Sequence, residues 1–284
     1  MSYVIPTRLI DDAVQAGVAK ATLSLGQLLA RGTLAGAILA CATTLAFTAT
    51  AETGLPLVGA LIFPFGFVMI VLLGLELVTG NFALIPLAVL ERRTTVRLML
   101  RNFGVVILGH LLGCGVYAGL YLATITRMGT DHTHPLVAVL IESAEDKTTG
   151  YAMLGASGIA LVVIKAILCN WMVALGVMLA LTSTSTGGKI VAMWLPVSMF
   201  VALGFEHAVV NMFVIPAGML LGADVGLGDW WGWNQLPVLI GNLIGAVTLC
   251  AGLLYASHRV RIRRLNASAE PLETVAPEPV LAGR

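Results

Sequence analysis

Two ionisable side chains, Glu206 and His207, stand next to each other inside an apolar stretch. Burying an ionisable group in apolar surroundings costs free energy, so such a group usually serves a function. An unperturbed imidazole titrates at about pH 6.5, which makes His207 a candidate for exchanging a proton with a substrate. The alternative is a neutral histidine that only bonds a neighbouring carbonyl group. Glu206 could likewise tether a loop by accepting backbone N–H bonds.

The segment around these residues repeats an earlier one. Residues 74–86 align without a gap with residues 204–216, and Gly, Glu, Asn, Ile and Pro match at identical spacing. Segments that flank these two copies also match each other, at nearly the same separation along the chain. The matched polar or basic residues are Glu76 and Glu206, Asn81 and Asn211, His110 and Asn242, and Arg31 and Lys165.

The other matched residues each have two interpretations. Asn81 and Asn211 fit helix N-caps, a local role that explains them adequately. His110 and Asn242 could bond the broken segments or line a pore. Lys165, in the middle of an apolar stretch, could be a buried charge near a pore or one half of a structural ion pair, including a pair with a neighbouring subunit.

These polar residues must be positioned by apolar membrane-spanning segments, and the composition indicates that the chain has such segments. The chain has 284 residues, of which 58% are hydrophobic and 11% charged, whereas soluble domains have about a quarter charged residues. A water-soluble globule is therefore excluded. A membrane span needs about 20 mostly apolar residues. Six stretches qualify: residues 28–50, 57–77, 103–126, 154–181, 190–205 and 236–257.

The matched segments fall where a span stops and a short apolar piece begins. These pieces, residues 82–90 and 212–221, are too short to cross a bilayer. Polar residues at such an interruption are tolerated only against protein or a wet cavity. Two broken helices at corresponding positions indicate a transport site, with half-helices beginning near Asn81 and Asn211. Three spans separate the copies, so the second copy is inverted relative to the first.

The Lys and Arg residues predict the orientation, because positive charge is retained on the cytoplasmic side. Segments that would face the cytoplasm carry most of them, whereas the outer loops carry Arg127 and Lys147. Both termini are therefore expected in the cytoplasm, in a multi-pass protein of the inner or plasma membrane. We expect a cytoplasmic segment over residues 1–27, a membrane domain over 28–257 with repeats of about 28–126 and 154–257, and a disordered cytoplasmic tail over 258–284.

Aromatic residues and one outer loop complete the candidates. Phe63, Phe67 and Phe200 lie within a few turns of the breaks, where they could form apolar constrictions or simply pack. The outer segment 131–134 contains Asp and His but no third well-spaced ligand, so no metal site is predicted. The basic run after His258 is interpreted as a topology anchor, and no nucleic-acid partner is expected.

The two break motifs, together with Cys169-Asn170-Trp171, resemble the formate/nitrite transporter family over nearly the whole chain. The resemblance implies an all-α, aquaporin-like fold of six transmembrane helices, assembled as a homopentamer with one pore per subunit. It also implies roles for individual residues. These are His207 as the central pore histidine, Thr79 as a loop threonine, Asn242 as a pore amide, and Phe63, Phe67, Leu77 and Phe200 as constriction residues.

The sequence departs from the family pattern at two positions. Where the family commonly has Asn in the third span, this chain has His110. A vestibule lysine that many members carry falls on Leu154 by ungapped counting. Lys147 lies further upstream and could replace it only if an insertion shifts the register.

The expected function is passage of small monovalent anions or their acids, formate first and nitrite next, linked to protons through His207. A bare anion in an apolar slit is strongly penalised, and protonation removes that charge. No cofactor is expected, and the only partners are the substrate, protons, the lipid bilayer and further copies of the chain. One alternative is a neutral-solute channel of the aquaporin class, although Asn81 and Asn211 are not followed by Pro-Ala. The other is an intramembrane enzyme using Glu206 and His207, for which no nucleophile is evident.

Overall fold

The computed structural model describes residues 3–258, and every element in that part of the chain is helical apart from one isolated bridge between Tyr3 and Ser183. The predicted tail beyond His258, with its basic run, lies outside the described residues. The elements are α1 (Pro6–Ala21), α2 (Leu25–Thr53), α3 (Pro56–Ile62), α4 (Pro64–Leu72), α5 (Val78–Leu90), α6 (Val96–Ile125), α7 (Pro135–Asp146), α8 (Thr149–Ala152), α9 (Ala156–Leu181), α10 (Thr186–Ala202), α11 (Ala208–Leu221), α12 (Leu227–Asp229), the π-helical η1 (Trp230–Gln235), α13 (Leu236–Ile244) and the π-helical η2 (Gly245–Gly252).

Four helices are long and apolar enough to cross a membrane. They are α2, α6, α9 and a continuous helix over Leu227–His258 that contains α12, η1, α13 and η2. Each covers one of the predicted spans. The other two predicted spans appear as shorter apolar helices, Pro56–Leu72 and Thr186–Ala202. Each of these is followed by an interruption and then by another short helix, α5 or α11.

The two interruptions are alike in backbone geometry. Gly74 and Gly204 both have φ of 64°, a left-handed conformation that glycine adopts without steric cost and that turns the chain out of the preceding helix. The half-helices begin at Val78 and Ala208, three residues before the expected starts at Asn81 and Asn211. The two asparagines therefore do not cap these helices, because each already lies inside the first turn and its side chain bonds elsewhere.

Small residues let the long helices approach each other closely. α2 packs on α6, and α9 packs on α13. A Cβ added at Gly113 would collide with the carbonyl oxygen of Thr33, and one added at Gly245 with the carbonyl oxygen of Ile167. Close backbone approach at small residues is how helices associate in membranes, where no hydrophobic force drives them together.

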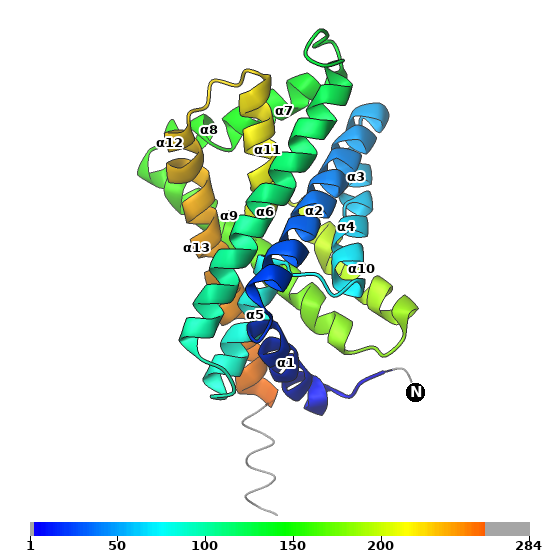
Figure 1. The fold of residues 1–284 in the computed structure, drawn as a ribbon, viewed down its shortest axis with the longest axis vertical. Helices are drawn as coiled ribbons and strands as arrows, with labels where there is room; N and C mark the ends of the chain where they lie inside the picture. The colour runs from blue at the N-terminus through cyan, green and yellow to red at the C-terminus, as the bar shows by residue number, and fades with distance from the viewer. Residues whose placement is uncertain (1–2, 259–284) are drawn as a thin grey trace, which may run out of the picture.

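Two helices at the ends of the molecule were not predicted. α1 lies in the expected N-terminal segment and packs on α5, while α7 lies between the expected repeats and packs on α11. Figure 1 shows α1 and α5 at one end of the molecule and α7 and α11 at the other. The first and last described residues both lie at the α1 end (Figure 1). We call this the proximal end and the opposite one the distal end.

Candidate functional site

A polar network stabilises the proximal interruption around the buried Glu76. Lys20 from α1 donates to Glu76 Oε1 at 2.8 Å, and Asn81 donates to Glu76 Oε2 at 2.7 Å. Asn102 from α6 accepts from the Asn81 amide at 2.8 Å and donates to the Lys20 carbonyl oxygen at 3.1 Å. One carboxylate therefore ties together α1, the interruption and α5, with α6 joined through Asn102.

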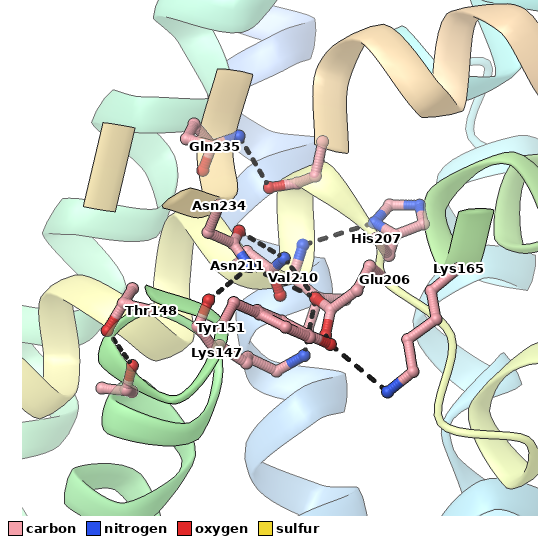
Figure 2. Close-up of polar contacts among 12 residues, drawn as sticks. Lys147, Thr148, Tyr151, Lys165, Glu206, His207, Val210, Asn211, Asn234 and Gln235 are labelled. Carbon is pink, nitrogen blue, oxygen red and sulfur yellow. Dashed lines mark hydrogen bonds and ion pairs between the residues drawn. The ribbon is translucent and has the colours of Figure 1, made fainter. Parts of the chain in front are cut away.

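The distal interruption has the same network, drawn in Figure 2. Lys147 donates to Glu206 Oε2 at 2.9 Å, and Asn211 donates to the same oxygen at 2.8 Å. Asn234 accepts from Asn211 at 2.8 Å and donates to the Lys147 carbonyl oxygen at 2.9 Å. One partner is extra, because Tyr151 Oη donates to Glu206 Oε1 at 2.9 Å.

Both acids thus stabilise their loops, but through side-chain donors and not the backbone N–H groups expected from the sequence. The two lysines were not identified from the sequence as members of a matched pair. A signal was present, because Lys20 precedes Glu76 by 56 residues and Lys147 precedes Glu206 by 59. The two lysine side chains are only 22% and 21% exposed, so each pair is largely shielded from solvent.

His110 and Asn242 lie behind the two half-helices and bond their first turns. His110 Nε2 accepts from the Val78 N–H at 3.1 Å, and its Nδ1 lies 2.9 Å from the Gly32 carbonyl oxygen. Asn242 Oδ1 accepts from the Ala208 N–H at 3.0 Å. Because Nε2 accepts, the neutral His110 ring carries its proton on Nδ1, and both ring nitrogens are occupied.

His207 is the N-cap residue of α11, and its ring reaches the first half of the molecule. Its Nδ1 accepts from the Val210 N–H at 3.3 Å, which places the proton of the neutral ring on Nε2. That nitrogen lies 3.2 Å from Thr79 Oγ1 in α5. The ring also stacks on Phe200, with centroids 5.5 Å apart. The positive end of the α11 dipole disfavours an imidazolium here, so the arrangement favours a neutral ring that donates from Nε2.

A cavity of about 360 Å³ reaches His207 from the distal end. Lys147 and Asn211 line it together with Phe63 and Phe200, whose rings meet edge to face with centroids 5.7 Å apart. A second cavity of about 210 Å³ lies towards the proximal end, and its lining includes Lys20, Lys189, Asn81, Phe67 and Leu77. The four predicted constriction residues thus fall in pairs, one pair on each cavity.

Comparison with known proteins identifies the family. A sequence model described as "Formate/nitrite transporter" matches residues 7–256. The chain belongs to the formate/nitrite transporter family. It is 35% identical to a probable formate transporter of Methanothermobacter thermautotrophicus over 249 residues, covering 82% of this chain and 89% of that protein. As a member, it is a multi-pass membrane protein of a family of transporters and channels, and the enzyme hypothesis is set aside.

Solved structures agree on the fold. An ion channel of the formate/nitrite transporter family superposes with a TM-score of 0.72 at 26% identity, over 88% of this chain and 99% of that one. A pentameric formate channel with formate bound superposes with a TM-score of 0.69 at 23% identity, over 83% of this chain and 98% of that one. The all-helical fold of this chain is therefore a fold of the formate/nitrite transporter family.

A lysine lines the distal cavity, but it is not the residue that ungapped counting gave. Leu154, which ungapped counting placed at the lysine position, is 54% exposed. Lys147 occupies the cavity instead, because α7 brings it back against Glu206. Lys165 has no carboxylate partner within residues 3–258, and its pairing with a neighbouring subunit stays a prediction. Its ammonium lies 3.3 Å from Tyr151 Oη and 5.7 Å from the centroid of that ring.

One further residue, Asn170 of α9, was used only to recognise the motif and is now placed at the centre. Its amide donates to the Thr79 carbonyl oxygen at 3.1 Å and to the Asn242 carbonyl oxygen at 2.7 Å. It therefore connects α5 with α13, one from each half of this formate/nitrite transporter. Its Oδ1 is buried without a partner among the described residues.

Proposed function

We propose that this protein is a channel for small monovalent anions and their conjugate acids, with formate the first candidate and nitrite the next. The observation that carries the proposal is the contact between His207 Nε2 and Thr79 Oγ1. It joins α5 to the N-cap of α11, between two cavities that are each lined by the lysine of one Lys–Glu pair. The relatives described as formate transporters and channels support the choice of substrate.

The distal cavity is suited to removing the charge of an entering anion. The lining is mostly apolar and contains one ammonium group, that of Lys147, which attracts an anion from water. Beyond Lys147, the rings of Phe63 and Phe200 narrow the way to His207. The transfer of a bare anion from water into such an apolar constriction costs much free energy. The anion crosses this part as the neutral acid, after taking a proton from water in the cavity.

In this proposal His207 donates a hydrogen bond and keeps its own proton. Protonating Nδ1 would displace the bond from the Val210 N–H and place a cation at the positive end of α11. The Nε2–H instead faces Thr79 Oγ1, which accepts its hydrogen bond and can donate its own O–H to a carboxyl oxygen of the substrate. The acid then reaches the proximal cavity past Phe67 and Leu77 and releases its proton near Lys20.

We further propose the finer architecture of six spans in two inverted halves, aquaporin-like in outline. Its support is the pairing of contacts around Glu76 with those around Glu206, and the position of α5 and α11 at opposite ends (Figure 1). The proximal end, which holds both described chain ends, faces the cytoplasm of an inner or plasma membrane. Five copies assemble, each with its own pore, as the pentameric formate channel that shares the fold suggests.

Uptake of labelled formate into proteoliposomes tests this function. We expect uptake to exceed that of protein-free liposomes and to rise as the external pH is lowered from about 7 to about 5, because crossing requires a proton. Uptake that equals the protein-free control at both pH values would exclude formate, and nitrite and other monovalent acids would then be compared in the same assay.

The neutral-solute channel is the second hypothesis that this assay addresses. The amide nitrogens of Asn81 and Asn211 already donate to side chains of their own networks, so they offer no pair of free N–H donors to a neutral solute. We therefore expect glycerol to enter no faster than in protein-free liposomes. Rapid swelling in glycerol without formate uptake would favour the neutral-solute channel.

A further inference from the structure

A third cavity of about 400 Å³ lies at the distal end beside the Glu206 network, and the proposed function does not use it. We call it the side chamber. Its lining includes Ser143 and Asp146 of α7, Tyr151 of α8, Leu154, and Lys165 of α9. Glu206 and Lys147 form part of its wall, and Lys147 also lines the cavity that reaches His207. Unlike that cavity, the chamber has a lining that is about half polar.

Lys165 gives the chamber an uncompensated positive charge. The side chain is partly buried, and its ammonium contacts only the hydroxyl and the ring face of Tyr151 (Figure 2). No carboxylate of the described residues lies within 4.0 Å of it. Glu206 is not available, because Lys147, Asn211 and Tyr151 already donate to it. An ammonium in a membrane span is costly unless an anion compensates it.

Asp146 places a negative charge at the exposed edge of the same chamber. It is the last residue of α7, it is exposed, and it forms no ion pair within the part of the chain that the structure describes. The chamber therefore presents a cation at the partly buried end and an anion at the exposed end. A ligand that matches both charges is zwitterionic, with its anionic group innermost.

Size and surroundings select among such ligands. A water molecule occupies about 30 Å³ of the liquid, so a chamber of about 400 Å³ is far larger than formate requires. Apolar side chains continue from Leu154, just before α9, onto α9 itself, and Leu154, Leu161 and Ile164 are 54%, 39% and 54% exposed. A ligand with a polar head and apolar chains can use both surfaces at once.

We propose that the side chamber binds the headgroup of a phospholipid that carries a phosphate and a primary amine, the phosphatidylethanolamine class. The phosphate accepts from the Lys165 ammonium, the lipid amine donates to Asp146, and the acyl chains lie along α9. Through Tyr151, which bonds both Lys165 and Glu206, the bound headgroup contacts the network that stabilises the distal interruption. This inference does not depend on which anion the channel conducts.

Native mass spectrometry of the purified oligomer, released from detergent after titration with defined lipids, tests the site. We expect the wild type to retain phosphatidylethanolamine on the order of tenfold better than phosphatidylcholine, whose quaternary ammonium has no N–H to donate to Asp146. Asp146→Asn should remove this preference and leave phosphatidylcholine retention unchanged. Lys165→Gln should lower retention of both lipids, since both carry the phosphate.

The matched control is Arg127→Gln, which removes a distal positive charge from a side chain that is 79% exposed and away from the chamber. It should retain both lipids as the wild type does. Equal retention of phosphatidylethanolamine by wild type and Lys165→Gln would overturn the proposal. So would dissociation of the Lys165→Gln oligomer with lipid retention intact, because Lys165 would then pair with a neighbouring subunit.

Discussion

The two buried imidazoles of the described chain each accept a backbone N–H, but through different ring nitrogens, so their neutral forms are different tautomers. His110 accepts at Nε2 and is bonded at both nitrogens to backbone groups. His207 accepts at Nδ1 and turns Nε2 towards Thr79 in the other half of the molecule. One ring therefore replaces an amide that supports a half-helix, while the other keeps a donor available between the cavities.

Replacing His207 by Asn separates these roles. Asparagine is among the best N-cap residues, so α11 keeps its cap and the fold should be retained. The donor to Thr79 is lost, and we expect formate flux in proteoliposomes to fall roughly twofold to tenfold, which corresponds to about 0.5–1.5 kcal/mol for a hydrogen bond between neutral groups. The measurement is labelled-formate uptake at two external pH values, with protein content matched.

The control for this variant is His110→Asn. Asn242 performs the corresponding task at the second half-helix, so an amide should serve at position 110 and leave flux and its pH profile close to the wild type. If His110→Asn lowered the flux and His207→Asn left it unchanged, the roles assigned to the two rings would have to be exchanged.

At the residue level, sequence reasoning identified groups that repeat within one unbroken alignment. Glu76 and Asn81 were found with their partners because residues 74–86 and 204–216 share one offset. Lys20 and Lys147 were not identified because they lie outside that segment, in α1 and at the end of α7. Their distances along the chain to the glutamates, 56 and 59 residues, are similar but not equal, and whether they reach the carboxylates depends on how α1 and α7 fold back.

The interruptions are the elements on which the site depends, and each begins with a glycine of positive φ. A Cβ at Gly204 would meet no atom within 4 Å, so substitution there changes only the backbone energy. We expect Gly204→Ala to lower the free energy of unfolding by about 1–2 kcal/mol, the cost of a left-handed conformation for a residue with a Cβ. Thermal unfolding of the purified protein in detergent measures this change.

Gly228→Ala is the matched control, because a Cβ there also meets no atom within 4 Å and the backbone φ is not positive. It should leave the unfolding temperature unchanged or raise it slightly, since alanine is a better helix former than glycine. A Gly204→Ala protein as stable as the Gly228→Ala protein would show that the interruption tolerates another backbone conformation.

At the level of elements, hydropathy located the apolar helices and the repeat located both interruptions. Neither signal located the starts of α5 and α11. Asn81 and Asn211 have the residue type of an N-cap, so the helices were expected to begin there, three residues too late. The Leu77 and His207 positions that precede these helices carry side chains that rarely cap. α7 was missed for a different reason. Its 12 residues are too short to span and were interpreted as an outer loop.

At the level of the whole molecule, the pairing of elements makes a prediction about orientation. α1 packs on α5 and α7 packs on α11, so each lysine reaches its glutamate from a different end of the molecule (Figure 1). The turn between α5 and α6 contains Arg92 and Arg93, which should be retained in the cytoplasm. The loop after α6, with Thr133, should then face outwards.

Cysteine labelling in intact cells checks this orientation. Cys41 is the exposed native cysteine of the described chain and is first replaced by Ala, whereas the other three are buried. A membrane-impermeant maleimide should label Thr133→Cys directly and Arg93→Cys only after permeabilisation, because both side chains are exposed but at opposite ends. The reverse pattern would place Lys20 and the smaller cavity at the outer surface, and Lys147 would then meet the anion on its way out of the cytoplasm.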